Sequence, residues 1–106
     1  MIYDVIIIGG GPAGAAAGIY SARKKLKTLI VMESFGGQSA IAESIENWIG
    51  AKKISGVEFA KMLEEHVKAQ ENIEIKIPEN AIDIKELSNG WKIATDKNNS
   101  YQAKVL

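Results

Sequence analysis

Residues 3–14, YDVIIIGGGPAG, contain the strongest indication of the fold. They include four consecutive β-branched residues, Val5 to Ile8, without polar alternation. Such a run is typical of a strand that is buried on both faces of a parallel sheet. The glycines then break the strand, and Ala15 to Lys24 predicts a helix whose basic end complements the helix dipole. Thr28 to Met32 predicts a second short strand, which completes a β-α-β unit.

The glycine turn has the spacing of a dinucleotide-binding fingerprint. Gly9, Gly11 and Gly14 form G-x-G-x-x-G between a predicted buried strand and a predicted helix, and acidic Glu33 ends the next strand. The first glycine permits a tight turn, the second lets the backbone approach a pyrophosphate, and the third lets the helix lie close to the strand. Pro12 suits the first helical turn, where its missing N–H costs little. The sequence therefore predicts a phosphate site at the helix N-terminus.

Glu33 predicts which adenosine the site accepts. A carboxylate at this position accepts hydrogen bonds from the ribose hydroxyls and selects an adenosine with a free 2′-hydroxyl. Ser34, Phe35 and Gly36 follow, with no Arg to receive a 2′-phosphate. FAD or NAD therefore fits the predicted site better than NADP, and the pattern alone does not distinguish FAD from NAD.

A long irregular connection is predicted between residues 34 and 54. Connections of this length are usually functional or disordered. Gly37 would let the backbone approach a flat ligand, Gln38 could bond the edge of a ring, and Asn47, next to Trp48, is a second candidate. Ordinary loop chemistry is the alternative interpretation of these residues, and their pattern alone favours it.

The second half of the chain predicts one helix and four strands. Ser55 and Glu58 have the spacing of a capping box, and Ala60, Leu63 and Val67 then fall on one apolar stripe. The predicted strands cover residues 73–77, 81–87, 91–95 and 101–106, and the last three predict an antiparallel meander. The predicted fold class is α/β and Rossmann-like, with a parallel sheet, two helices and a C-terminal β-meander. Because the chain stops inside an apolar run, we expect an incomplete domain whose last strand presents an unpaired edge.

Composition excludes several functional classes. Lys and Arg (13) balance Asp and Glu (13), which argues against a nucleic-acid-binding surface. Without a single Cys, the chain holds no disulfide, no redox-active dithiol and no Cys-ligated metal. The sequence has no metal-ligand cluster and no membrane span, so we expect a soluble, cytoplasmic protein. The single histidine, His66, is interpreted as a solvated helix residue.

The motifs together resemble a known family. The fingerprint at residues 3–14, G-G-Q at residues 36–38 and I-E-N-W at residues 45–48 occur in the order and spacing of thioredoxin reductases. The flavoprotein component of alkyl hydroperoxide reductase has a similar pattern. The resemblance is to the N-terminal FAD-binding segment of these enzymes and covers the whole chain. One departure is Ile49, where the common family pattern has Pro, which favours the peroxide-reductase or a divergent branch.

The resemblance implies a homodimeric flavoenzyme that passes electrons from NADPH or NADH through FAD to a protein disulfide, such as that of a thioredoxin-like acceptor. It implies that the fingerprint and Ala13 hold the pyrophosphate of FAD, and that Glu33 and Ser34 lie at the adenosine ribose. It places Gly37, Gln38 and Asn47 on the flavin side and the backbone of Ala81 at the adenine. Residues 1–106 would be the N-terminal part of an FAD/NAD(P)-binding domain, and the nicotinamide domain and the C-terminal FAD segment lie outside this sequence. By itself, this chain is expected to be inactive.

Two other functional classes stay open. One is a free-standing module that binds an adenine dinucleotide without turnover, and an unpaired last strand would argue against it. The other is part of an NAD-dependent dehydrogenase, in which G-G-Q and E-N-W would have no role.

Overall fold

A mixed six-stranded sheet runs through the middle of the molecule, and the computed structural model describes residues 1–106. The elements are β1 (Ile2–Ile8), α1 (Pro12–Arg23), β2 (Thr28–Val31), the 3-10 helix η1 (Gly37–Ile41), α2 (Gly56–Lys68), β3 (Ile73–Lys76), β4 (Ala81–Leu87), β5 (Gly90–Thr95) and β6 (Ser100–Val105). The strand order is β3-β2-β1-β6-β5-β4. Strands β3, β2, β1 and β6 are parallel, and β4, β5 and β6 form the antiparallel meander. The predicted α/β class is confirmed.

The last strand lies in the interior of the sheet. Strand β6 pairs with β1 on one side, where Tyr3 lies opposite Ala103, and with β5 on the other, where Trp91 lies opposite the same residue. The prediction that the last strand presents an unpaired edge is therefore wrong. The free edges belong to β3 and β4, because β6 joins the meander to the parallel strands.

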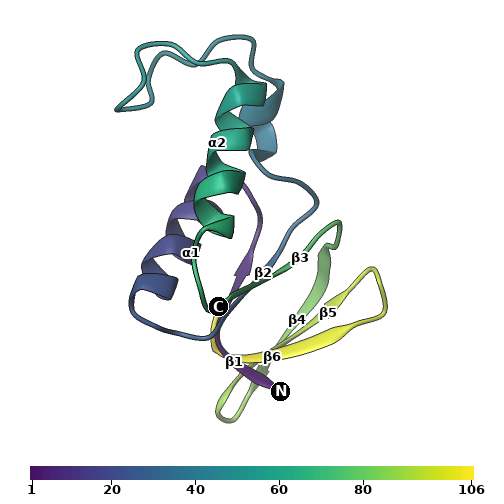
Figure 1. The fold of residues 1–106 in the computed structure, drawn as a ribbon. Coiled ribbons are helices and arrows are strands. Elements are labelled where there is room, and N and C mark those ends of the chain that lie inside the picture. The colour runs from purple at the N-terminus through teal and green to yellow at the C-terminus, as the bar shows by residue number, and fades with distance from the viewer.

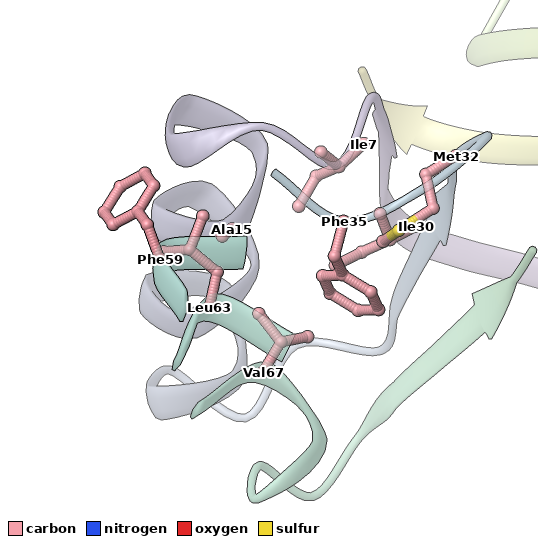
Figure 2. Packing of buried hydrophobic residues seen from close by; sticks show 8 residues of the cluster. All are labelled: Ile7, Ala15, Ile30, Met32, Phe35, Phe59, Leu63 and Val67. Carbon is pink, nitrogen blue, oxygen red and sulfur yellow. The ribbon is translucent and has the colours of Figure 1, made fainter. Parts of the chain in front are cut away.

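The helices cover one face of the parallel strands. Figure 1 shows α1 and α2 side by side, with the strands of the meander extending away from the helices. Leu63 and Val67 of α2 pack with Ala15 of α1 and with Ile7 and Ile30 of the sheet, and Figure 2 shows these side chains gathered in one cluster. Phe59 is buried in the same cluster, whereas Ala60, predicted on the apolar stripe, is only half-buried. The buried face of α2 therefore includes Phe59 in addition to the predicted Leu63 and Val67.

The meander buries the opposite face of β1 and β2. Ile6 and Leu29, which are register partners, pack there with Ile93 of β5 and Ala103 of β6. Because Ile7 and Ile30 face the helices, β1 and β2 are covered on both faces, as their unbroken apolar runs predict. Neither helix combines the length and the apolar character needed to cross a bilayer.

The connection at residues 34–54 has more regular structure than predicted. Gly36, in a left-handed conformation (φ 92°), is the N-cap of η1. Ile45 and Ile54 form an antiparallel bridge with N···O distances of 2.7 and 2.9 Å. The N–H of Gly56 at the start of α2 donates to the carbonyl of Ala42 at 2.9 Å. Contacts with α2 therefore order this connection, and such contacts leave no periodic signal in the sequence.

Helix α1 begins earlier than predicted. It starts at Pro12 rather than Ala15, with Gly11 as its N-cap, and it ends at Arg23. The turn is tight because Gly9 adopts a φ of 114°, so that the chain leaves β1 and enters the helix almost at once. The first turn of α1 therefore lies at the carboxyl end of β1, next to the predicted phosphate site.

Candidate dinucleotide-binding site

A crevice of about 310 Å³ lies at the carboxyl ends of β1 and β2. In open α/β sheets this is where ligands bind, next to the strand at which the chain order reverses. That strand is β1, because β2 lies on one side of it and β6 on the other. The lining residues come from three segments: Ile8, Gly9, Gly10 and Gly11; Val31, Met32, Glu33, Ser34 and Gly37; and Glu79, Asn80 and Ala81.

The glycine turn forms one wall of the crevice, and its three fingerprint glycines have different surroundings. A Cβ at Gly14 would overlap the carbonyl oxygen of Gly9, so this glycine is required for close packing of helix on strand. A Cβ at Gly9 would meet nothing within 4 Å, and one at Gly11 only the carbonyl oxygen of Gly36, at 3.9 Å. At these two positions the protein leaves space that a ligand could approach closely.

The N-terminus of α1 has the character of an anion site. Its N-cap is Gly11, which has no side chain to cap the helix, and the first turn contains no acidic residue. The first N–H groups of a helix have no intrahelical acceptor, and the helix dipole is positive there. These donors fit the pyrophosphate of a dinucleotide.

Glu33 lies at the opposite wall, immediately after β2, and is exposed. Its Oε2 accepts a hydrogen bond of 2.6 Å from the Nδ2 of Asn80, which immediately precedes β4. The side chain of Asn80 also donates to Asp96, in the turn between β5 and β6, at 3.1 Å. The carboxylate that the sequence predicts at the ribose is thus held by a residue distant in sequence.

Glu79 is a charged residue of the crevice that sequence reasoning missed. It is buried, and its carboxylate accepts hydrogen bonds from the hydroxyl of Tyr101 at 2.9 Å and from Nδ2 of Asn99 at 3.3 Å. Burial opposes ionisation, but the hydrogen bonds from Thr95, Tyr101 and Asn99 outweigh it and lower the pKa of Glu79. Burial is the largest cause that raises the pKa of Tyr101 to about 12, and the hydrogen bond to the Glu79 carboxylate is the second. Neither the strand pattern nor a motif marks Glu79 or Asn80, because both follow Pro78 in an irregular segment.

The structure brings six of the predicted site residues together. The residues that line the crevice are Gly9, Gly11, Glu33, Ser34, Gly37 and Ala81. The loop carrying Gly37 is attached to the glycine turn, because the N–H of Gly36 donates to the carbonyl of Gly10 at 2.8 Å. Ala81, at the start of β4, reaches the crevice because Glu79 donates its N–H to the carbonyl of Met32 at 2.9 Å.

The other predicted residues lie outside this crevice. Pro12 lines a groove between α1 and α2, and Ala13 and Gly14 border a separate apolar hollow beside Leu106. Gln38 and Asn47 are exposed, the first in η1 and the second in the connection between η1 and α2. They do not touch the crevice that Glu33 lines.

The fold is that of a Rossmann-like protein of the mixed α/β class, with an open crevice at the carboxyl ends of β1 and β2. The sequence model of the pyridine nucleotide-disulphide oxidoreductases matches residues 3–106, and the chain belongs to this family. Its relatives include a component of the alkyl hydroperoxide reductase of Pseudomonas aeruginosa, 42% identical over 91% of this chain and 16% of that protein. They also include a protein named NADH dehydrogenase of Bacillus subtilis, 54% identical over 62% of this chain and 13% of that protein.

Solved structures that resemble this chain include thioredoxin reductases. The enzyme of T. acidophilum matches 98% of this chain with a TM-score of 0.89 and 34% identity, and that of Lactococcus lactis matches 97% with a TM-score of 0.90 and 32% identity. This chain covers 34% of each of those chains. It therefore spans 13% to 16% of the two relatives named above and about a third of these reductases.

Proposed function

We propose that this chain is the FAD-binding N-terminal part of a thioredoxin-reductase-like oxidoreductase. That enzyme would pass electrons from NADPH or NADH through FAD to a protein disulfide. The observation that carries the proposal is the crevice itself, in which the glycine turn, the N-terminus of α1 and Glu33 surround one space at the carboxyl ends of β1 and β2. Family membership and the likeness to thioredoxin reductases support it.

In this proposal, residues 1–106 are the first part of an FAD/NAD(P)-binding domain. The nicotinamide domain, the redox-active dithiol and the C-terminal FAD segment would be supplied by other parts of the enzyme. The absence of Cys from the chain supports this division, because a disulfide reductase needs a dithiol. The complete enzyme would be a homodimer that acts on a thioredoxin-like protein, and this chain alone would bind the cofactor without turnover.

The site residues divide by the part of FAD that each would hold. Gly9, Gly11, Pro12, Ala13 and Gly14 would surround the pyrophosphate, because their backbone forms the turn and the first helical residues of α1. Glu33 and Ser34 would accept hydrogen bonds from the ribose hydroxyls, and the backbone of Ala81 would border the adenine. Gly37, Gln38 and Asn47 would lie on the flavin side. Bound FAD would supply the two-electron chemistry, and the chain would supply position and electrostatics.

The test is the visible absorption spectrum of the purified chain, followed by titration calorimetry with FAD and with ADP. We expect either flavin absorption bands in the purified protein or binding of added FAD or ADP at one site per chain. A chain that binds neither FAD nor ADP would contradict the proposal. In the complete enzyme, Asn47→Ala should change the flavin spectrum and leave ADP affinity unchanged, and an unchanged spectrum would remove Asn47 from the site.

The second candidate is a free-standing adenine-dinucleotide-binding module. The position of β6 favours it, since both sides of the last strand are paired and the objection from an unpaired edge no longer holds. A module that recognises only the adenosine diphosphate part would bind FAD and ADP equally and leave flavin fluorescence unchanged. A flavin-binding part would bind FAD more tightly than ADP and change its fluorescence.

A further inference from the structure

Asn80 bridges two carboxylates at the end of the crevice that Glu33 lines. We propose that Asn80 is a positioning residue that fixes Glu33 for the ribose, and that Asp96 behind it makes the site reject a 2′-phosphorylated adenosine. The inference rests on the proposed function, since it concerns how the same crevice selects its nucleotide. It assigns the selection to three residues from separate segments rather than to Glu33 alone.

The backbone of Asn80 is anchored to the turn between β5 and β6. The N–H of Asn80 donates to Oδ1 of Asp96 at 3.0 Å, and the N–H of Asp96 donates to the carbonyl of Asn80 at 3.0 Å. This reciprocal pair fixes the backbone of Asn80, and its exposed side chain is held by the bonds to Glu33 at 2.6 Å and to Asp96 at 3.1 Å. Asp96 therefore positions Asn80, and Asn80 positions Glu33.

The side-chain amide of Asn80 can take only one orientation here. Its Nδ2 donates to Glu33 and to Asp96, and both partners are carboxylates, which accept and do not donate. A flipped amide would direct its oxygen at two negative groups. Both amide hydrogens are used in this way, so the group that Asn80 has left for a ligand is its oxygen, an acceptor.

This end of the crevice consequently favours hydrogen-bond donors over negative charge. Glu33 and Glu79 line it, Asp96 lies one hydrogen bond behind Asn80, and no Lys or Arg is among the lining residues. Lys76 and Lys97 are close enough to influence Glu79 and Asp96, but neither lines the crevice. The hydrogen bonds from the backbone and the side chain of Asn80 lower the pKa of Asp96, so this carboxylate keeps its charge to a lower pH than an ordinary aspartate does.

Ser34 is the side chain in this wall that can donate a hydrogen bond to a phosphate, and its hydroxyl carries no charge. A ribose with two hydroxyls offers donors to Glu33 and to the oxygen of Asn80. A 2′-phosphate replaces one donor by a group that only accepts and brings further negative charge near Glu33 and Asp96. The site is therefore built for an unphosphorylated ribose.

The test is titration calorimetry of the full chain with two probes, ADP and ADP carrying a 2′-phosphate. We expect the wild type to bind ADP at least about tenfold more tightly than the phosphorylated form. Asp96→Asn keeps an oxygen for the N–H of Asn80 but removes the charge, and should reduce this ratio about threefold or more. Asn80→Leu, of similar size, should weaken ADP binding about threefold to tenfold through loss of the bond to Glu33.

Matched controls separate these effects from a general loss of structure. Asp83→Asn changes an exposed carboxylate of β4, and Asn89→Leu changes an exposed amide of the β4–β5 turn. Both variants should leave unchanged the affinity for ADP and its ratio to the affinity for the 2′-phosphorylated form. Raising the salt concentration should reduce the ratio in the wild type and have less effect in Asp96→Asn, because screening acts on the charge. A purely structural role of Asp96 would not produce this difference in salt dependence.

The outcomes separate the inference from the proposed function. If the wild type binds neither FAD nor ADP, the proposed function fails and the inference with it. If the wild type binds ADP but Asp96→Asn retains the full ratio, or Asn80→Leu retains full affinity, the inference alone is overturned.

Discussion

Gly11 and Gly14 belong to one turn but meet opposite surroundings. At Gly11 the backbone has an ordinary φ of −75°, and an added Cβ would lie 3.9 Å from its nearest neighbour. At Gly14 an added Cβ would overlap the carbonyl oxygen of Gly9. There is open space beside Gly11 for an added methyl group, and there is none beside Gly14.

Alanine at these two positions should therefore separate binding from stability. We expect Gly11→Ala to leave the urea unfolding midpoint nearly unchanged and to weaken ADP binding strongly, because the methyl group occupies the space beside the phosphate turn. Gly14→Ala should lower the free energy of unfolding by about 1–3 kcal/mol, since α1 must move away from β1. Equal losses of stability in both variants would contradict the assignment of Gly11 to binding and of Gly14 to packing.

Glu79 should make the stability of the chain depend on pH. Its folded-state pKa is lowered by hydrogen bonds that outweigh burial, so its contribution is complete above the unfolded-state pKa of about 4.3 and is lost as the pH falls through the folded-state value. We expect urea unfolding to show a loss of stability below about pH 4.3, and this loss should be smaller in Glu79→Gln. Glu86→Gln, at an exposed position of β4, is the control and should retain the wild-type pH dependence.

At the scale of elements, α2 joins the long connection to the core. Its N-cap is Ser55, whose Oγ accepts from the N–H of Glu58 at 3.1 Å and donates to the carboxylate of Glu58 at 2.9 Å. Ser55 is confirmed as the predicted N-cap, and the Glu58 carboxylate bonds the Ser55 hydroxyl rather than the backbone N–H that a capping box uses. The next residue, Gly56, holds the connection through its bond to Ala42, so the start of α2 also fixes the end of the loop that begins at Gly36.

Removing the Ser55 hydroxyl should consequently lower the free energy of unfolding more than removing the hydroxyl of an exposed serine in a turn. We expect Ser55→Ala to lower the free energy of unfolding by about 1 kcal/mol, measured by urea unfolding followed by circular dichroism. Ser88→Ala, in the exposed turn between β4 and β5, should be nearly neutral. If both variants lose the same stability, the cap at Ser55 is not the cause.

At the scale of the whole molecule, the sheet has a protected interior and two free edges. Strands β2, β1, β6 and β5 have neighbours on both sides, and β3 and β4 have one neighbour each. Strand β4 is also exposed over most of its length, with Ile82 67% and Ile84 51% exposed. The parallel half and the meander are joined by the pairing of β1 with β6.

Amide hydrogen exchange should follow this arrangement. We expect the slowest exchange in β1, β2 and β6 and the fastest strand exchange in β4, because local opening is easiest at an exposed edge with few buried contacts. Fast exchange throughout β6 would contradict its interior position. Ala103→Asp places a charge between Tyr3 and Trp91 and should destabilise the parallel strands and the meander together. Gln102→Asp, at an exposed position of the same strand, should not have this effect.

Much of the fold could be predicted because its signals are local. The unbroken apolar run before Gly9, the spacing of the glycines and the capping box at Ser55 each lie within a few residues and each predicted the correct element. The limits of α1 and of the meander strands were correct to within a few residues. The order in the connection after Gly36 was missed, since it depends on α2 rather than on its own sequence.

The candidate site divides in the same way. The glycine turn and Glu33 are defined by spacing along the chain, and Gly9, Gly11 and Glu33 line the crevice. Glu79 and Asn80 could not be found, because their place beside Glu33 depends on how the segment after β3 folds back and on Asp96 in a distant turn. A carboxylate and an amide in an irregular segment have no periodicity to mark them.

The β-α-β unit, the glycine turn, the acidic residue after the second strand and the lack of any thiol can be read from the amino-acid sequence, since each depends on residues close together in the chain or on composition. The place of β6 beside β1 and the link that Asn80 makes between Glu33 and Asp96 follow from the folded arrangement of distant segments. Strand order and side-chain bridges arise from pairing between distant segments, and the free energy of such pairing depends on the packing of the whole sheet rather than on local pattern.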